Sequence, residues 1–356
     1  MENRLANLIQ HATVPPESVI ELLKNTLIGT EGSRYQLLDT VNRIHQLDHP
    51  HFFYLERNKK ALGTVTICER QVMLGQTGKT ALYMRYFAFD KIVQGSSDKV
   101  RERNSVFDQY WKKIFQTGQL GDAETEEKST FFWGYIDPQN LRSFRMNERF
   151  GFESAGTFTI TAFSRFNPKN SDQVTRITLD EKEEVLNRLK EFYKGYNFFS
   201  TAHLFEQDNY FVLKDQGKIV AGIQVFHAGY KVISLPGRTG KILVKILPHV
   251  PLIRKIFNPD NFRFLATEGI FWLPGYEAKV EVILEAVLAQ NKLNTLLMYE
   301  DSRVNKIKSL GLKTGLLQKL KKNNEIHIVV RPVNLNESEY KHLMMNPTYL
   351  SGFDMV

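Results

Sequence analysis

The sequence predicts an α/β protein made of two tandem domains, each with a mixed α+β sheet. A chain of 356 residues is too long for one ordinary domain and suits two. Hydrophobic residues make up 42% of the chain, enough for each half to bury a core of its own. The order of predicted elements in the first half also returns in the second, although the sequence match between the halves is faint.

In the first half, residues 1–166, apolar spacing and turn residues predict each element. A proline pair opens a helix (PPESVIELLKNTL), and two β-type runs around a polar turn at Asn58–Lys60 predict a hairpin. An aromatic-rich run (TALYMRYFAFD) predicts a central strand, and Ser-Ser-Asp at 96–98 is a good N-cap for the helix after it. A strand (TFFWGYID), a short helix and an alternating strand (SAGTFTITAFSRF) complete the half.

After a linker at 167–173, the second half, residues 174–333, repeats this order. It predicts a capped helix, a hairpin turning at Asp215–Gly217, a strand (FRFLATEGIFWL), an amphipathic helix (GYEAKVEVILEAVLAQNKL), a strand (NTLLMYED), a basic helix and a closing strand (EIHIVVRPV). A basic insertion, residues 231–259, has no counterpart in the first half. The tail, 334–356, is expected to pack onto a domain that the sequence does not specify.

The net charge is +8, and the segments 216–259 and 302–324 contain no Asp or Glu. Such stretches suit an anionic ligand, which includes a phosphorylated cofactor, acidic lipid or nucleic acid, or they form a solvated basic face. No nucleic-acid recognition module accompanies them, so a nucleic-acid partner is not expected. Segment 241–257 (KILVKILPHVPLIRKIF) suits short amphipathic pieces on an anionic membrane, but a helical cover over the cleft of the second domain is the favoured alternative.

The single cysteine, Cys68, excludes a disulfide framework and a cysteine metal cluster, and it fits a reducing cytosol. No early run is apolar enough for a signal peptide or a membrane span. We therefore expect a cytoplasmic protein. The nine histidines show no metal-ligand spacing, so no metal is expected.

The stretch NLRSFRMNERFGF, residues 140–152, combines a strand exit, a short helix and a Gly-Phe stop. The side chain of Asn140 can cap the helix, and Gly151 supplies a left-handed stop. Asn140, Ser143, Gly151 and Phe152 resemble the last motif of the GNAT superfamily, the acyl-CoA N-acyltransferases. Residues 300–312 resemble a weakened copy of the motif, with Glu300 in place of the Asn.

The resemblance implies two tandem acyl-CoA N-acyltransferase-like domains, in which parted central strands hold pantetheine. It implies direct attack by an amine on acyl-CoA, with acetyl-CoA or another acyl-CoA as the acyl donor and an amine-bearing small molecule or peptide as partner. No covalent nucleophile is needed. The alternative is a catalytically degenerate acyl-CoA-binding or interaction protein, associated with anionic surfaces.

Two family features are altered in this sequence. The pyrophosphate turn keeps Gln94, Gly95 and Ser96 without the usual spacing in the first half, and it is shortened around Gly275 in the second. The position of the family's acidic tyrosine, seven residues after the Asn, holds Asn147 or Ile307. Either another group protonates the thiolate, or one or both halves do not catalyse.

Candidate site residues follow from the same resemblance. Glu268 is the candidate base, or else a surface or core-edge carboxylate, and Tyr135 and Tyr299 are candidate acids, or else core aromatics. The backbone on two strands is expected to pair with pantetheine, at Phe87, Ala88 and Phe89 and at Ile270, Phe271 and Trp272. The motif residues Asn140 and Ser143 complete the predicted cofactor site with Gln94, Gly95, Ser96 and Gly275.

Overall fold

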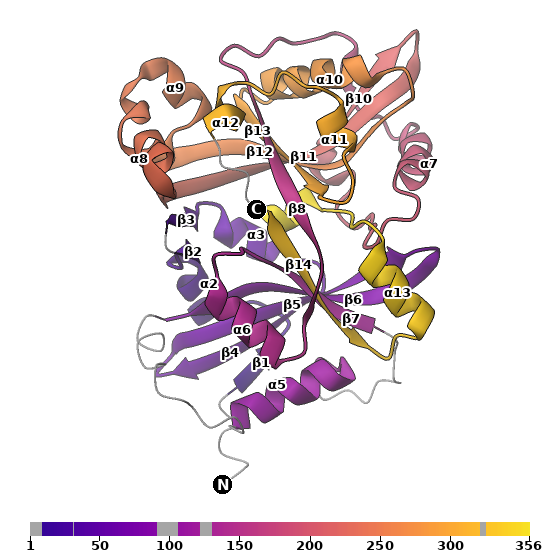
Figure 1. Cartoon of the computed structure of the whole chain (residues 1–356). Coiled ribbons are helices and arrows are strands. Elements are labelled where there is room, and N and C mark those ends of the chain that lie inside the picture. The colour runs from indigo at the N-terminus through magenta and orange to yellow at the C-terminus, as the bar shows by residue number, and fades with distance from the viewer. Residues whose placement is uncertain (1–8, 31, 91–105, 122–129, 321–324) are drawn as a thin grey trace. The chain divides into compact units, whose positions relative to one another are not determined.

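The computed structural model describes residues 9–30, 32–90, 106–121, 130–320 and 325–356 (Figure 1). Contacts along the chain divide it into two compact units. Unit 1 takes the described residues of Met1–Ile28, Asp39–Ala155 and His327–Met345, and unit 2 takes those of Gly29–Leu38, Gly156–Ile326 and Asn346–Val356. Each unit combines helices with a mixed sheet, so the predicted fold class is confirmed.

The sheet of unit 1 has the strand order β1-β4-β5-β6-β7-β14. Its neighbours run antiparallel except for β6 and β7, which run parallel. The strands are β1 (Ile9–Ala12), β4 (Pro50–Arg57), β5 (Lys60–Leu74), β6 (Thr77–Phe89), β7 (Thr130–Ile136) and β14 (Ile326–Val333). The helices are α2 (Glu17–Lys24), α3 (Thr40–His45), α5 (Val106–Thr117), α6 (Leu141–Arg149) and α13 (Glu337–Met345).

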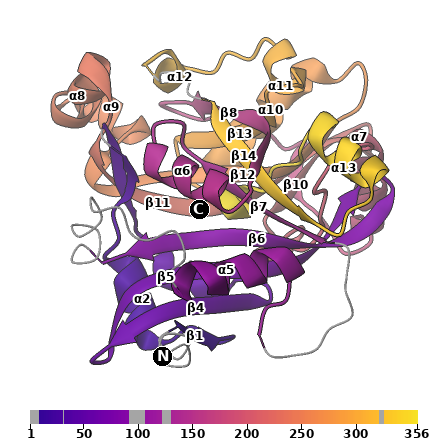
Figure 2. The same ribbon diagram turned by 60° about the horizontal axis from the view of Figure 1, so that its bottom comes forward.

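Helix α5 lies along the sheet of unit 1 and closes its aromatic core (Figure 2). Trp111, Ile114 and Phe115 recur at helical spacing and pack against Phe53 and Phe132 of the strands. The predicted helix is therefore confirmed from Val106 onward. Its predicted N-cap at 96–98 lies outside the described residues.

The hairpin predicted around Asn58–Lys60 is also present in unit 1. Strands β4 and β5 pair up to Arg57↔Lys60, and Asn58 and Lys59 both adopt positive φ, 52° and 60°. Two successive left-handed residues form the turn that suits the right-handed twist of a two-residue hairpin. Buried Cys68 lies on β5, within this sheet.

The sheet of unit 2 has the strand order β8-β13-β12-β11-β10-β9, and β3 pairs with the end of β11. Strands β12 and β13 are its parallel pair. The strands are β2 (Ile28–Thr30), β3 (Ser33–Leu37), β8 (Glu153–Ser164), β9 (Val174–Arg176), β10 (Tyr210–Asp215), β11 (Lys218–Ser234), β12 (Phe262–Trp272) and β13 (Thr295–Asp301). The helices are α7 (Lys182–Phe192), α8 (Gly237–Lys245), α9 (Pro251–Ile256), α10 (Glu277–Gln290), α11 (Lys306–Ser309) and α12 (Leu316–Leu320), with short 3-10 turns η1 (Glu206–Asp208), η2 (Leu247–His249), η3 (Pro259–Asn261) and η4 (Gly352–Met355).

Helix α10 fills the core of unit 2 as the long helix predicted there. Its apolar positions Val280, Ile283, Leu284 and Val287 recur at i, i+3, i+4 and i+7, and all are buried. They pack with buried side chains of the neighbouring strands, including Leu265 of β12. In the described part of the chain, no helix is both long and apolar enough to span a bilayer.

The compact units divide the chain differently from the predicted domains 1–166 and 174–333. Strand β8 follows helix α6, yet it pairs with β13 of unit 2. Strand β14, predicted to close the second domain, pairs with β7 of unit 1, with His327 opposite Ile136 and Val333 opposite Thr130. Alternating apolar residues identify a strand but not its partner, because pairing is a non-local choice.

Candidate functional site

In each unit the two parallel strands pair over a short length and then part. In unit 1 the ladder between β6 and β7 runs from Thr80↔Thr130 to Tyr83↔Trp133, although β6 continues to Phe89. In unit 2 the ladder between β12 and β13 has two pairs, Leu265↔Leu296 and Ala266↔Leu297, and β12 continues to Trp272. We call the place in each unit where the parallel strands stop pairing, beyond the last pair, its notch.

A β-bulge lies at the same place in both notches. The register between β5 and β6 shifts at Thr64/Thr66, and that between β11 and β12 shifts at Gly222/Gln224. The left-handed residue, with φ of 53°, is Tyr86 in unit 1 and Gly269 in unit 2, in each case three residues after the last parallel pair (83 to 86, and 266 to 269). The extra residue of a bulge leaves backbone groups out of the ladder and turns them toward new partners.

The bulge of unit 1 holds a bulky residue in a conformation that usually belongs to glycine. A left-handed tyrosine stores about 1–3 kcal/mol of strain, which the surrounding fold has to offset. The guanidinium of buried Arg85 lies 4.6 Å from the centre of the Tyr86 ring, and burial raises the pKa of the Tyr86 hydroxyl. Strained backbone of this kind is found most often at ligand-binding and catalytic sites.

The predicted pantetheine-pairing residues of unit 1 follow this bulge on β6. Phe87 is 39% exposed and contacts Phe89 edge-on at 4.9 Å, whereas Ala88 is buried. Tyr135 lies on the facing strand β7, where its ring packs 5.9 Å from Tyr83. The structure therefore brings the predicted strand residues and the predicted acid of unit 1 to the same pair of strands.

The motif at 140–152 forms the helix stop that the sequence predicts. Asn140 Oδ1 accepts a hydrogen bond from the backbone N–H of Ser143 at 3.1 Å, which caps α6. Gly151 has φ of 75°, and buried Phe152 donates its N–H to the carbonyl of Asn147 at 2.9 Å. A cofactor role for Asn140 and Ser143 stays a prediction beside this capping role. The predicted pyrophosphate residues Gln94, Gly95 and Ser96 lie outside the described residues.

In unit 2 the candidate base Glu268 is buried, with 3% of its surface exposed, one residue before the bulge. Its carboxylate accepts hydrogen bonds from the Tyr349 hydroxyl at 3.2 Å, from the Ser351 hydroxyl, and from the N–H of Phe353 at 3.4 Å. Burial raises the pKa of Glu268, against nearby His203 and the hydrogen bonds, which lower it. Glu268 thus binds the last residues of the chain, which the sequence did not predict.

Those last residues, 346–356, line the notch of unit 2. The N–H of Thr348 donates to Asp301 of β13 at 2.8 Å. Gly352 lies so close to β12 that an added Cβ would stand 2.4 Å from the carbonyl oxygen of Thr267. The segment therefore contacts both of the parted strands and fixes them through its own backbone.

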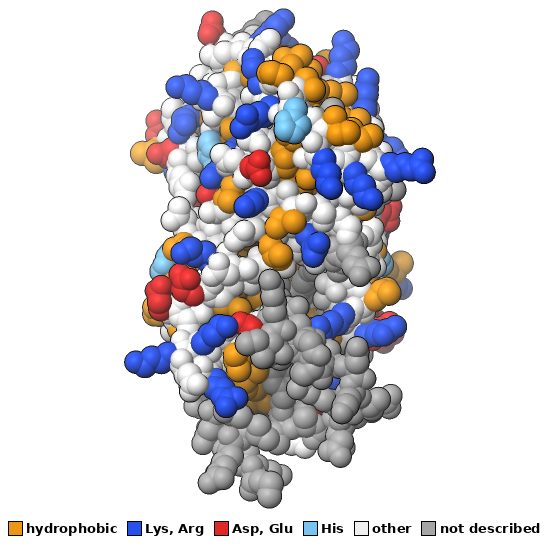
Figure 3. Space-filling model, turned by 90° about the vertical axis from the view of Figure 1, so that its left-hand side faces the viewer, with side chains coloured by type: hydrophobic (Ala, Val, Ile, Leu, Met, Phe, Trp, Pro, Cys, Tyr) orange, Lys and Arg blue, Asp and Glu red, His pale blue; other side chains and the backbone are white. Residues whose placement is uncertain are grey.

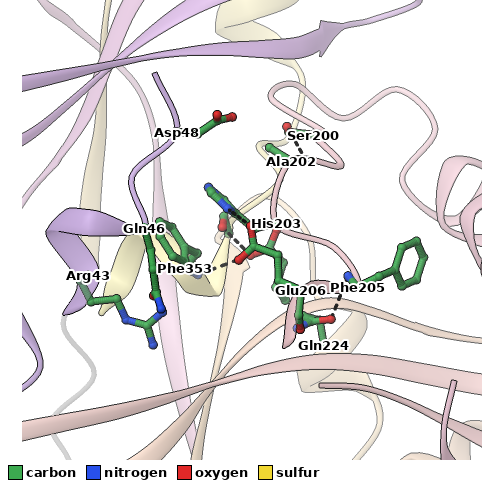
Figure 4. A network of polar contacts seen from close by, with 12 residues as sticks. Arg43, Gln46, Asp48, Ser200, Ala202, His203, Phe205, Glu206, Gln224 and Phe353 are labelled. Atoms are coloured by element: carbon green, nitrogen blue, oxygen red, sulfur yellow. Dashed lines mark hydrogen bonds and ion pairs between the residues drawn. The ribbon is translucent and has the colours of Figure 1, made fainter. Parts of the chain in front are cut away.

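Phe353 anchors the segment from the other side. Its ring is fully buried and stacks on His203 with 3.8 Å between centroids (Figure 4). His203 Nδ1 lies 3.2 Å from Glu206, and buried Gln224 accepts the N–H of Phe205 at 3.1 Å, so the loop around His203 is itself fixed to β11 (Figure 4). This part of unit 2 is a packed core.

Other groups that the sequence assigned to a cofactor in unit 2 already bind protein atoms. The carbonyl of Ile270 accepts the Tyr193 hydroxyl at 2.7 Å, and Phe271 is 1% exposed. The N–H of Gly275 donates to the carboxylate of Glu277 at 3.2 Å, where a phosphate would have to bind. Trp272 packs edge-on against Phe192 at 4.9 Å.

The remaining candidate acid, Tyr299, lies on β13 opposite Ile160 of β8, and burial raises its hydroxyl pKa. Glu300, which replaces the motif's Asn, accepts a hydrogen bond from the N–H of Ile307 at 2.7 Å. It therefore binds the backbone of the next helix, α11. Across the described residues, no three His, Cys, Asp or Glu side chains converge to hold a metal. Tyr193, at the C-cap of α7, and Tyr349 were missed because the groups that they bind lie 77 and 81 residues away in the sequence.

Solved structures share the arrangement of helices and strands described above. No protein-family model and no curated protein matches the sequence. Three structures of Saccharomyces cerevisiae N-myristoyltransferase with bound myristoyl-CoA match 93%, 97% and 98% of this chain and 86%, 85% and 86% of their own, at 8–9% identity and TM-scores of 0.55, 0.56 and 0.55. The chain therefore shares the fold of these N-myristoyltransferase structures, in agreement with the kind of fold that the sequence predicts.

Proposed function

We propose that this chain is an N-acyltransferase in which unit 1 binds acyl-CoA in the notch between β6 and β7. The observation that carries the proposal is the parting of these strands after Tyr83↔Trp133, at a bulge kept in spite of a left-handed Tyr86. The structural neighbours contain myristoyl-CoA, which supports acyl-CoA as the ligand class. We place the acyl-CoA in unit 1 because residues 346–356 already line the equivalent notch of unit 2.

In the proposed reaction the nitrogen of an amine attacks the thioester carbonyl carbon, and the carbon–sulfur bond breaks. Backbone N–H groups freed by the bulge at Tyr86 donate to the carbonyl oxygen as it gains negative charge. The hydroxyl of Tyr135 on β7 donates its proton to the leaving thiolate and is restored by the proton that the amine loses. The amine that accepts the acyl group belongs to a small molecule or a peptide. The first experiment measures which length of acyl chain the protein transfers.

The experiment uses the whole chain with a series of acyl-CoAs from acetyl to myristoyl and a mixture of primary amines. We expect at least one acyl-CoA to raise the thermal midpoint and to release free CoA when an amine is present. The variant Gly134→Leu adds a side chain on β7 just past the last parallel pair, where its Cβ fits at 3.5 Å from the Met84 carbonyl oxygen. Because a misplaced thioester reacts slowly, transfer should fall about 100-fold.

The matched control is Gly78→Leu, the same substitution at a β6 position with open space around it. It should leave binding and transfer unchanged. Tyr135→Phe should lower the rate of CoA release while the stabilisation by acyl-CoA persists. Stabilisation without any transfer would favour the acyl-CoA-binding alternative, and no response to any acyl-CoA would contradict the proposal.

A further inference from the structure

The basic insertion forms an outward surface in unit 2 that carries both cations and aliphatic side chains. Helix α8 and its C-cap expose side chains that are spaced as one face of a helix, namely Arg238, Lys241, Ile242, Lys245 and the C-cap Ile246. The short turn η2 and helix α9 continue this surface. We call residues 237–256 the α8–α9 surface.

Its aliphatic side chains are unusually exposed for a folded segment. Ile242 is 44% exposed, Ile246 58%, Val250 42% and Leu252 49%. Single exposed aliphatic residues are common on protein surfaces and need no explanation. Four of them within residues 242–252 form a cluster, and a cluster of this kind indicates an interaction surface.

The inner side of the same segment is well packed. The exposed aliphatic side chains therefore belong to a folded surface that the rest of unit 2 holds in place. Leu243 and Ile256 are buried, at 4% and 3% exposed. Gly240 lies against Leu235, where an added Cβ would stand 2.5 Å from the backbone. The Thr295 hydroxyl of β13 donates to the carbonyl of Ile256 at 2.8 Å, which fixes the end of α9.

The cations of the surface have no acidic neighbours in sequence, since 216–259 contains no Asp or Glu. Lys241, Lys245, Arg254 and Lys255 are exposed, and in the described part of the chain none of them forms an ion pair. In the upper part of Figure 3, hydrophobic side chains in orange are surrounded by Lys and Arg in blue. Apolar groups and unpaired cations therefore share one face.

We propose that the α8–α9 surface binds a bilayer that contains anionic phospholipids. Cations near such a surface are attracted to lipid phosphates, and aliphatic side chains gain by entering the boundary with the acyl chains. A second copy of the chain suits the surface less well, because a two-fold contact would bring its cations against identical cations. The inference is independent of acyl transfer, and its test contains no acyl-CoA.

The test is cosedimentation of the whole protein with vesicles of phosphatidylcholine, with or without phosphatidylserine. We expect binding to the anionic vesicles that weakens as salt rises, and little binding to phosphatidylcholine alone. Lys241→Gln with Lys245→Gln should weaken binding roughly 25-fold, since each cation contributes a factor of about five. Ile246→Ser with Leu252→Ser should weaken it by removing the apolar contact.

The matched controls lie elsewhere on unit 2. Lys190→Gln with Lys194→Gln changes two exposed lysines of the α7 region, and Leu179→Ser changes a leucine that is 80% exposed. Both should bind like the unchanged protein. A second charge variant, Arg254→Gln with Lys255→Gln, repeats the test if the first alters the thermal midpoint.

Three outcomes would overturn the proposal. The first is equal binding to both kinds of vesicle, or none. The second is binding that all the surface variants retain. The third is a dimer in solution that Ile246→Ser with Leu252→Ser dissociates, with no vesicle binding by the unchanged protein, because the occupant is then a second copy.

Discussion

In unit 1, β6 leaves β7 three residues before a left-handed tyrosine, and in unit 2, β12 leaves β13 three residues before a left-handed glycine. The two notches share this geometry but differ in their contents. Residues 346–356 line the notch of unit 2 and bind Glu268, whereas Phe87 beside the notch of unit 1 is 39% exposed. The same backbone device thus occurs twice in the chain, and in unit 2 it is part of a packed core.

Removing the anchor of the terminal segment should give the largest effect on stability. Phe353→Ala deletes a fully buried ring, so we expect unit 2 to lose about 3–5 kcal/mol. Hydrogen exchange should report the loss as faster exchange of the β12 amides, with β6 amides of unit 1 less affected.

Met345→Ala is the control for this prediction, because Met345 is 66% exposed and its truncation should change stability little. If Phe353→Ala left the exchange of β12 unchanged, the segment would not be holding the notch of unit 2. Equal acceleration in β6 and β12 would show that the two notches are not energetically distinct.

A smaller effect should distinguish the two bulges. Gly269→Ala places a Cβ on a left-handed residue, 2.8 Å from the Leu204 side chain, and should cost about 1–2 kcal/mol. Denaturant unfolding measures this cost, with Gly78→Ala, in open space at ordinary φ, as the control. A Gly269→Ala variant as stable as the control would mean that the bulge of unit 2 relaxes freely and is not a constrained copy of that in unit 1.

The capped helix of the motif should show an effect smaller again. Asn140→Ala removes the acceptor for the Ser143 N–H and should cost about 1 kcal/mol, while Asn140→Ser should restore most of it. Exchange of amides in α6 is the measurement. If Ala and Ser variants lose transfer equally without a change in α6, Asn140 acts on the cofactor, as the family resemblance implies, rather than as a cap.

Several local features of the two units were predictable from the sequence. The Asn140 cap, the Gly151 stop and the turn predicted around Asn58–Lys60 depend on residues close in sequence, and each is present. The family resemblance also placed Glu268 on the strand before the turn. Such features are visible in a sequence because their partners lie within a few residues.

The contents of the notches were not visible in the sequence. Tyr349 and Ser351 bind Glu268 from 81 and 83 residues away, and a short aromatic tail has no periodicity that names its partner. The partner of β14 was hidden for the same reason. The left-handed conformation of Tyr86 was not predicted for a different reason. An aromatic residue in a β-type run predicts extended backbone, and the surrounding fold overrides that preference.

The smallest effect should be a pH dependence that belongs to unit 2. Burial raises the pKa of Glu268, so the folded state holds its proton more tightly than the unfolded state does. Its stabilising contribution is therefore complete below the ordinary carboxyl pKa and is lost as the pH rises through the raised one. Glu268→Gln cannot ionise and should lose less stability over that range than the unchanged protein, as thermal unfolding at successive pH values will show. A variant whose difference from the unchanged protein stays constant with pH would mean that the hydrogen bonds from Ser351 and Phe353 cancel the cost of burial, and that this carboxylate is ionised in the notch.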